Sequence, residues 1–155
     1  MSAYIHFFVR VEDKFCPIAT YCRSSQVFEL MHLRAPYEHI KALNSDALTN
    51  YEIKAKEILD EWNARKRKYE KRKEIIATFN NSVEEKMEMI HDSDEAIEEI
   101  EYEISEAEFV IKFIYFLEHI IREVDYNAPE GIDKDNYLYY GIECYRPTVE
   151  DIEDR

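Results

Sequence analysis

The fold is decided by residues 48–83, which read LTNYEIKAKEILDEWNARKRKYEKRKEIIATFNNSV. They lie inside a run of 92 residues, 37–128, that contains neither Gly nor Pro. Loops and strands normally need such residues, so the run is predicted to be helical. Steps of three and four residues connect eleven positions, nine of them apolar or aromatic, which is typical of a coiled-coil seam. These positions are Leu48, Tyr51, Ala55, Ile58, Trp62, Arg65, Tyr69, Arg72, Ile76, Phe79 and Val83.

A second stepped series of apolar residues follows the first along the chain. Its members are Ile97, Ile100, Ile104, Ala107, Ile111 and Ile114, and beyond Phe109 the stripe becomes broader. A narrow stripe packs on one helix, whereas a broad stripe packs on a sheet or on several neighbours. Together the two series predict a long antiparallel coiled-coil helical hairpin over about residues 46–124.

Two places can hold the turn of this hairpin. The tripeptide Asn-Asn-Ser that ends at Ser82 offers a helix cap, and Ser82 with Glu85 has the spacing of a capping box. The tripeptide that begins at Asp92 also offers caps, with acids that suit the first turn of a helix. Because the seam continues to Val83, we place the turn near Asp92 and keep a turn near Asn81 as the alternative.

The two ends of the chain alternate with a period of two, as strands do. Strands are predicted at 4–11, 15–22 and 136–145, and Ser24 or Ser25 caps a short helix at 26–33. The predicted fold class is therefore α+β, a small antiparallel sheet with the helical hairpin. We expect one domain over 1–155, comprising a β-hairpin and short helix (1–45), the helical hairpin (46–124) and a C-terminal strand with a loose acidic tail from residue 148 (125–155).

Composition excludes several classes of function. The 155 residues contain 34 acids and 20 bases, a net charge of −14, which disfavours direct contact with nucleic acid or with a membrane surface. The only glycines are Gly131 and Gly141, so neither a P-loop nor a GxGxxG turn is present. The longest apolar run, 109–117, is too short to span a membrane. Three cysteines without a CxxC pair indicate a reducing compartment, and we expect the cytoplasm.

No catalytic motif is evident, and we expect a protein that is not an enzyme and has no cofactor. The pairs Glu29–His32 and Glu88–His91 have the spacing of di-metal helix ligands, but chance gives about one such pair in a chain this rich in Glu. A carboxylate/His metal site is therefore only a remote alternative to ordinary surface pairs. The free cysteines are interpreted as small buried hydrophobes, since no nucleophile elbow accompanies them.

Charge is distributed unevenly along the helical run. Residues 64–73 contain seven bases and one acid, whereas residues 84–108 contain twelve acids and one base. The basic stretch is interpreted as a solvated face that pairs with acids of the other helix, with a nucleic-acid contact as the alternative. The acidic stretch either keeps the hairpin soluble or docks on a basic protein face in place of nucleic acid.

The leading hypothesis is a non-enzymatic acidic protein-binding module, an inhibitor that mimics DNA. Its predicted partner-binding residues are Glu95, Glu98, Glu99, Glu101, Glu103, Glu106 and Glu108, with Tyr137, Tyr139 and Tyr145 as exposed anchors. The predicted partner is a protein with a basic surface. The alternative is a structural protein that forms a homodimer through its heptads, with Arg65 and Arg72 at seam positions specifying the assembly.

Overall fold

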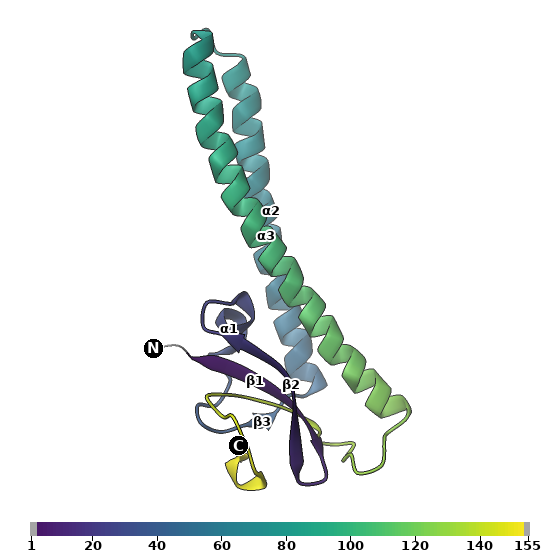
Figure 1. The fold of residues 1–155 in the computed structure, drawn as a ribbon. Helices are drawn as coiled ribbons and strands as arrows, with labels where there is room; N and C mark the ends of the chain where they lie inside the picture. Colours follow the sequence, from purple (N-terminus) through teal and green to yellow (C-terminus); the bar gives the residue numbers. More distant parts are fainter. Residues whose placement is uncertain (1–2, 154–155) are drawn as a thin grey trace. The chain divides into compact units, whose positions relative to one another are not determined.

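The computed structural model describes residues 3–153, and it has the predicted α+β fold (Figure 1). In chain order its elements are β1 (Tyr4–Val11), β2 (Lys14–Cys22), α1 (Gln26–Met31), β3 (Lys41–Ala42), α2 (Ser45–Ala77), α3 (Val83–Tyr126), β4 (Leu138–Ile142) and the short 3₁₀ helix η1 (Val149–Asp151). By internal contacts the chain divides into two units, the sheet unit (Met1–Lys54 with Val110–Arg155) and the hairpin unit (Ala55–Phe109). The expectation of a single domain stays a prediction. Among residues 3–153, no helix combines the length and the apolar character that crossing a membrane requires.

The sheet unit is built on four antiparallel strands in the order β2-β1-β4-β3. The predicted N-terminal hairpin and C-terminal strand are present, and β4 pairs with β1 from Ile5 opposite Ile142 to Val9 opposite Leu138. The register of β1 and β2 shifts after Phe7, which leaves Ile18 as the extra residue of a bulge. The two-residue strand β3 was not predicted, because so short a segment carries no periodicity.

One face of the sheet packs on the ends of both long helices that belong to this unit. The Phe7 ring meets the Phe113 ring of α3 edge-on, with centroids 4.8 Å apart. The Tyr51 hydroxyl of α2 and the Tyr140 hydroxyl of β4 are 3.0 Å apart in a buried hydrogen bond. Leu117 of α3 is completely buried. The prediction that the broad end of the second apolar stripe packs on a sheet is therefore confirmed.

The other face of the sheet is also covered, which the sequence did not predict. Phe8, Ile40, Tyr139 and Cys144 form a buried cluster, and Ile152 of the tail packs against it. The tail is fixed there because the Ile40 amide donates to Asp151 O at 3.0 Å and the Glu153 amide donates to Ile40 O at 2.7 Å. The predicted loose tail is therefore wrong for residues 148–153, while residues 154–155 lie outside the described part.

Gly141 permits this arrangement at the centre of the sheet. A Cβ atom added at Gly141 would overlap the carbonyl oxygen of His39, so only glycine allows residues 36–40 to run so close to β4. The close approach is held by the Ile142 amide, which donates to Pro36 O at 2.8 Å, and by the Glu38 amide, which donates to Ile142 O at 2.7 Å.

The helical hairpin turns between Ala77 and Val83, so the preferred turn near Asp92 is wrong and the alternative near Asn81 is correct. The Ser82 hydroxyl caps α3 by accepting a hydrogen bond from the Glu85 amide at 3.2 Å. The Asn81 side-chain amide donates to Glu85 Oε2 at 2.9 Å. Both contacts stabilise the first turn of α3, where backbone amides otherwise lack partners.

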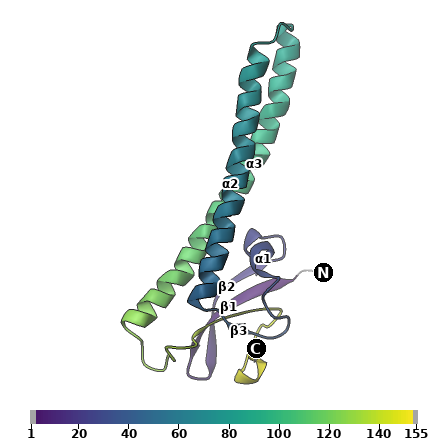
Figure 2. The same cartoon turned by 180° about the vertical axis from the view of Figure 1, so that it is seen from behind.

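The seam led to the wrong position for the turn because its last two residues are not buried between the two helices. Phe79 and Val83 are 40% and 72% exposed, so the apolar spacing continues through the turn without any packing behind it. Ser93 is instead 2% exposed inside α3, where a small side chain fits the space between the two helices. Figure 2 shows α2 and α3 side by side through the hairpin unit from the opposite direction.

Candidate functional site

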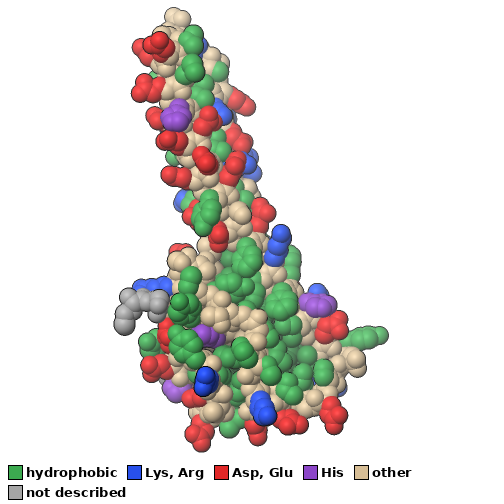
Figure 3. All heavy atoms as spheres, in the orientation of Figure 1, with side chains coloured by type: hydrophobic (Ala, Val, Ile, Leu, Met, Phe, Trp, Pro, Cys, Tyr) green, Lys and Arg blue, Asp and Glu red, His purple; other side chains and the backbone are tan. Residues whose placement is uncertain are grey.

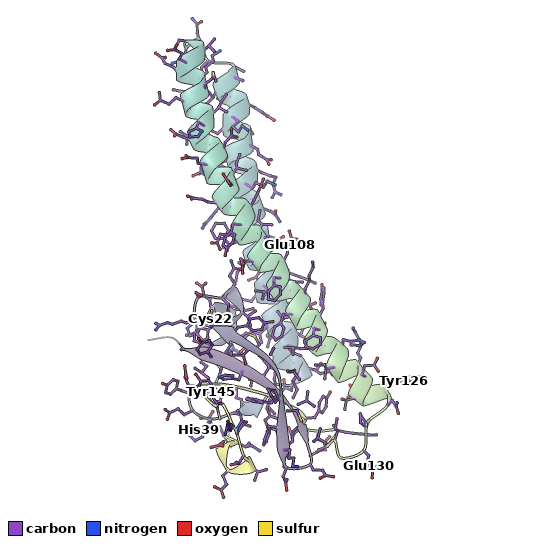
Figure 4. All side chains as sticks on the ribbon, viewed as in Figure 1. Cys22, His39, Glu108, Tyr126, Glu130 and Tyr145 are labelled. Carbon is purple, nitrogen blue, oxygen red and sulfur yellow. The ribbon has the colours of Figure 1, made fainter. Side chains whose placement is uncertain are left out.

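The seven predicted glutamates lie on α3 within the hairpin unit, and we call them the acidic surface (Glu95, Glu98, Glu99, Glu101, Glu103, Glu106 and Glu108). Glu103 and Glu106 are half-buried, and the other five are exposed. Acidic side chains crowd the hairpin in the space-filling view (Figure 3), and Figure 4 labels Glu108 on α3. The structure therefore brings the seven glutamates together on one helix.

The acidic surface is positioned by the apolar seam of the same helix. Ile100, Ile104 and Ala107 are at most 8% exposed, so they fix the side of α3 that contacts α2. Because a helix has 3.6 residues per turn, the glutamates between these seam residues are distributed over the remaining circumference. The seam thus determines which carboxylates solvent can reach.

Two ion pairs connect the acidic helix to the basic one. Lys66 Nζ lies 3.4 Å from Glu101 Oε1, and Lys73 Nζ contacts Asp94 Oδ1 at 2.5 Å. Lys73 follows Lys66 by seven residues on α2, and Asp94 precedes Glu101 by seven residues on α3. Two antiparallel helices with heptad repeats pair in this way. This agrees with the interpretation that the basic stretch pairs with acids of the other helix. The neighbouring Arg65, Arg67, Lys68, Lys71 and Arg72 are exposed.

An open groove of about 530 Å³ lies beside the acidic surface, within the hairpin unit. It is lined by Trp62, Ile100 and Tyr102 together with three glutamates of the acidic surface, Glu98, Glu99 and Glu103. Tyr102 is 64% exposed, and the guanidinium carbon of Arg65 lies 4.6 Å from the centre of the Trp62 ring. Trp62 was predicted only as a seam residue and Tyr102 was not a predicted site residue, so the groove was not foreseen from the sequence.

The predicted exposure of two of the three tyrosines is wrong. Tyr139 is 3% exposed, because the cluster on the second face of the sheet covers it. Tyr137 is 6% exposed, and its hydroxyl donates to Ile121 O of α3 at 3.3 Å. It lies one residue before β4 begins, so the alternation of side chains along that strand does not apply to it. Burial, with a smaller effect of Asp125, raises the pKa of Tyr137 to about 12.

Tyr145 is 58% exposed and keeps the accessibility that a binding anchor requires. Its hydroxyl donates to Glu143 Oε2 at 2.6 Å, and this bond raises the pKa of Tyr145 to about 12. Figure 4 labels Tyr145 beyond the end of β4. Tyr145 belongs to the sheet unit, whereas the acidic surface belongs to the hairpin unit.

The cysteines differ from one another in their surroundings. Cys144 is buried, as predicted, and burial raises the pKa of its thiol. Cys16 and Cys22 are exposed, so the prediction of burial is wrong for both, because β2 is an edge strand with few buried positions. The Ser24 hydroxyl, 3.1 Å from Cys22 Sγ, lowers the pKa of the Cys22 thiol.

The two histidines with metal-ligand spacing make other contacts. His32 Nδ1 lies 2.9 Å from Glu29 O, a backbone atom, and the ring stacks on Phe28. His91 Nε2 lies 3.1 Å from Glu95 Oε1, one turn further along α3. Throughout the described chain, no three or more His, Cys, Asp or Glu side chains form a group that could hold a metal ion.

No protein-family model, curated protein or solved structure matches this chain.

Proposed function

We propose that this chain is a non-enzymatic protein-binding module that docks its acidic surface on a basic face of another protein. The partner's face is one that otherwise holds nucleic acid, so the module acts as an inhibitor that mimics DNA. The exposed glutamates of α3 support this proposal, because they present many carboxylates on a helix whose rotation is fixed by its seam.

The axial spacing of the carboxylates is the observation that carries the proposal. The seven glutamates from Glu95 to Glu108 occupy about 20 Å of helix axis, since an α-helix rises about 1.5 Å per residue. That is one carboxylate for about every 3.3 Å, close to the 3.4 Å between phosphates along one DNA strand. Along its axis α3 therefore has a density of negative charge similar to that of one DNA strand, with the carboxylates distributed around the exposed circumference and Glu101 also paired with Lys66.

Electrostatics further favours a basic partner and a fast encounter. Residues 80–155 carry a net charge of −17, and complementary charge raises association rates and discriminates against acidic partners. We place the encounter in the cytoplasm, because Cys16, Cys22 and Cys144 are all free thiols. Exposed Cys16 and Cys22 would be open to oxidation outside a reducing compartment.

Homodimerisation through the heptads stays as the alternative proposal. It depends on Arg65 and Arg72, whose side chains are exposed in the single chain and are therefore accessible to a second copy. Measuring the molecular mass by light scattering over a wide concentration range tests it directly. A constant monomer mass would exclude the assembly.

Reversing four charges tests the acidic surface. The chain is immobilised, nuclease-treated lysate is passed over it, and a salt gradient releases what has bound. We expect the variant with Glu98, Glu99, Glu101 and Glu103 all changed to Lys to lose the basic proteins that the unchanged chain retains. Added DNA should compete those proteins from the unchanged chain, since both bind the same basic face.

A matched control separates the site from the overall charge. Changing Glu57, Asp60, Glu74 and Glu130 to Lys alters the net charge equally at exposed positions outside the acidic surface. This control variant should retain the partner, and thermal unfolding should verify that both variants fold. Equal retention by the unchanged chain and by the acidic-surface variant would refute the proposal.

A further inference from the structure

The groove beside the acidic surface is lined by aromatic side chains and by carboxylates. Trp62 and Ile100 come from the facing sides of α2 and α3, and Tyr102 adds a second aromatic ring. Glu98 and Glu99 are exposed at its edge. We propose that this groove binds the guanidinium group of an arginine side chain presented by a protein partner. The inference rests on the proposed function and names the anchor of that partner.

The chemistry of the lining selects a planar cation. A guanidinium stacks on aromatic faces and forms paired hydrogen bonds with carboxylates, whereas an ammonium acts as a compact, strongly hydrated charge. The groove offers both features, aromatic rings from Trp62 and Tyr102 and carboxylates from Glu98 and Glu99. A neutral side chain would lack the charge attraction to these carboxylates, and an acidic side chain would meet like charge.

The chain itself provides an example of the proposed contact. The guanidinium of Arg65 lies over the Trp62 ring, with its carbon 4.6 Å from the ring centre. Trp62 is thus oriented so that a guanidinium reaches its face. Arg65 is itself exposed and is not among the residues that line the groove.

The position of the groove also suits a binding hot spot. Hot spots are enriched in Trp, Tyr and Arg, and surrounding groups exclude water from them. Carboxylates on an open helix face are individually weak contacts, because water and salt screen them. An arginine that lies against Trp62 or Tyr102 adds stacking on an aromatic ring to its attraction to Glu98 and Glu99.

Trp62 is the only tryptophan of the chain, so its fluorescence reports on the groove directly. The probe is a nine-residue Gly/Arg peptide with blocked ends, titrated at about 150 mM salt while calorimetry records its affinity. Two control peptides replace each Arg by neutral, planar citrulline or by Lys. We expect the Arg peptide to shift Trp62 emission as it binds, and citrulline to reduce affinity at least about tenfold. Lys should reduce affinity about threefold or more.

Variants of the groove have matched controls elsewhere in the chain. Tyr102→Ala should weaken the Arg peptide about fivefold or more, whereas Tyr37→Ala, at another exposed tyrosine, should leave affinity within about twofold. The double variant Glu98→Gln with Glu99→Gln should weaken binding about tenfold. Glu84→Gln with Glu88→Gln removes the same charge from exposed positions outside the groove lining and should have a much smaller effect.

The outcomes distinguish failure of this inference from failure of the proposed function. If groove variants and their matched controls weaken the peptide equally, binding depends on diffuse charge and the groove is not a site. The same conclusion follows if the peptide does not bind, or binds without changing Trp62 emission. The proposed function of the acidic surface would still be tested by the four-charge reversal, because that experiment measures captured partner proteins and not the peptide.

Discussion

His6 is a buried ionisable residue on a strand that the sequence predicted correctly. It is 6% exposed, its Nδ1 lies 3.0 Å from Thr20 Oγ1, and its Nε2 has no hydrogen-bond partner among residues 3–153. The ring packs edge-on against Tyr145, with centroids 4.6 Å apart. Burial lowers the pKa of His6, and nearby Glu143 opposes this effect only in part. An imidazolium is therefore less favourable at this position than in the unfolded chain.

The lowered pKa of His6 gives stability a pH dependence of known sign. In the unfolded chain His6 gains a proton as the pH falls through about 6.5, whereas in the folded chain it does so only at lower pH. The contribution of neutral His6 is thus present above pH 6.5 and is lost as the pH falls below it. We expect denaturant titrations to show a larger loss of unfolding free energy between pH 7.5 and 5.5 for the unchanged chain than for His6→Gln.

The comparison isolates His6 because all other ionisable groups are shared by the two proteins. Protonation of the many carboxylates changes stability in both proteins to a similar extent. An equal pH dependence in the two proteins would show that His6 keeps an ordinary pKa in the folded state.

At the scale of elements, the turn of the hairpin was decided by a short polar sequence. The Ser82 cap and the Asn81–Glu85 contact begin α3, while Asp92 lies inside it. The apolar seam, with its steps of three and four residues, predicted both helices, but it did not predict where α2 ends and α3 begins. Apolar spacing says which side of a helix is buried, whereas a turn depends on which backbone amides and carbonyls lose their partners.

Single substitutions at the two candidate turns give different expected costs. Ser82→Ala should lower the unfolding free energy by about 1 kcal/mol, because the Glu85 amide loses its hydrogen-bond acceptor. Asp92→Ala, inside α3, should change it by less than about 0.5 kcal/mol, as exposed surface substitutions do. Denaturant unfolding of the two variants measures both costs. The reverse order would place the turn near Asp92.

At the scale of the whole molecule, the charge imbalance limits stability. The net charge of −14 comes entirely from residues 80–155, which carry −17, and twelve of their acids lie within residues 84–108. Like charges along one helix repel each other, and the ion pairs Lys66–Glu101 and Lys73–Asp94 are partly exposed and offset only a small part of this. Acidity that costs stability in this way is consistent with a role in binding.

Salt should therefore stabilise the folded chain. Raising salt from about 0.01 M to 0.1 M shortens the Debye length from about 30 Å to 10 Å and weakens the repulsion among the glutamates. We expect thermal scans to show a higher Tm at the higher salt concentration. A variant with Glu98, Glu99, Glu106 and Glu108 changed to Gln should show a smaller rise. A fall of Tm with salt would mean that ion pairs dominate over repulsion.

The amino-acid sequence predicted the fold class, the first strand, the two long helices and a serine cap for α1, although it left Ser24 and Ser25 both open for that cap. Each of these depends on residues close together in the chain, whose spacing or capping groups are visible without a structure. It also placed the acidic glutamates on one helix, because the seam fixes the faces of that helix. These features are local, and local spacing is enough to predict them.

Only the tertiary structure decided which surfaces remain open. Tyr139 is buried because Ile40 and Ile152 of the tail cover the second face of the sheet, and Ile40 is 99 positions from Tyr139 in the chain. The groove exists because the position of the turn brings Trp62 of α2 beside Tyr102 of α3. A strand pattern says which side chains share a face, but the elements that later pack on that face determine whether solvent reaches it.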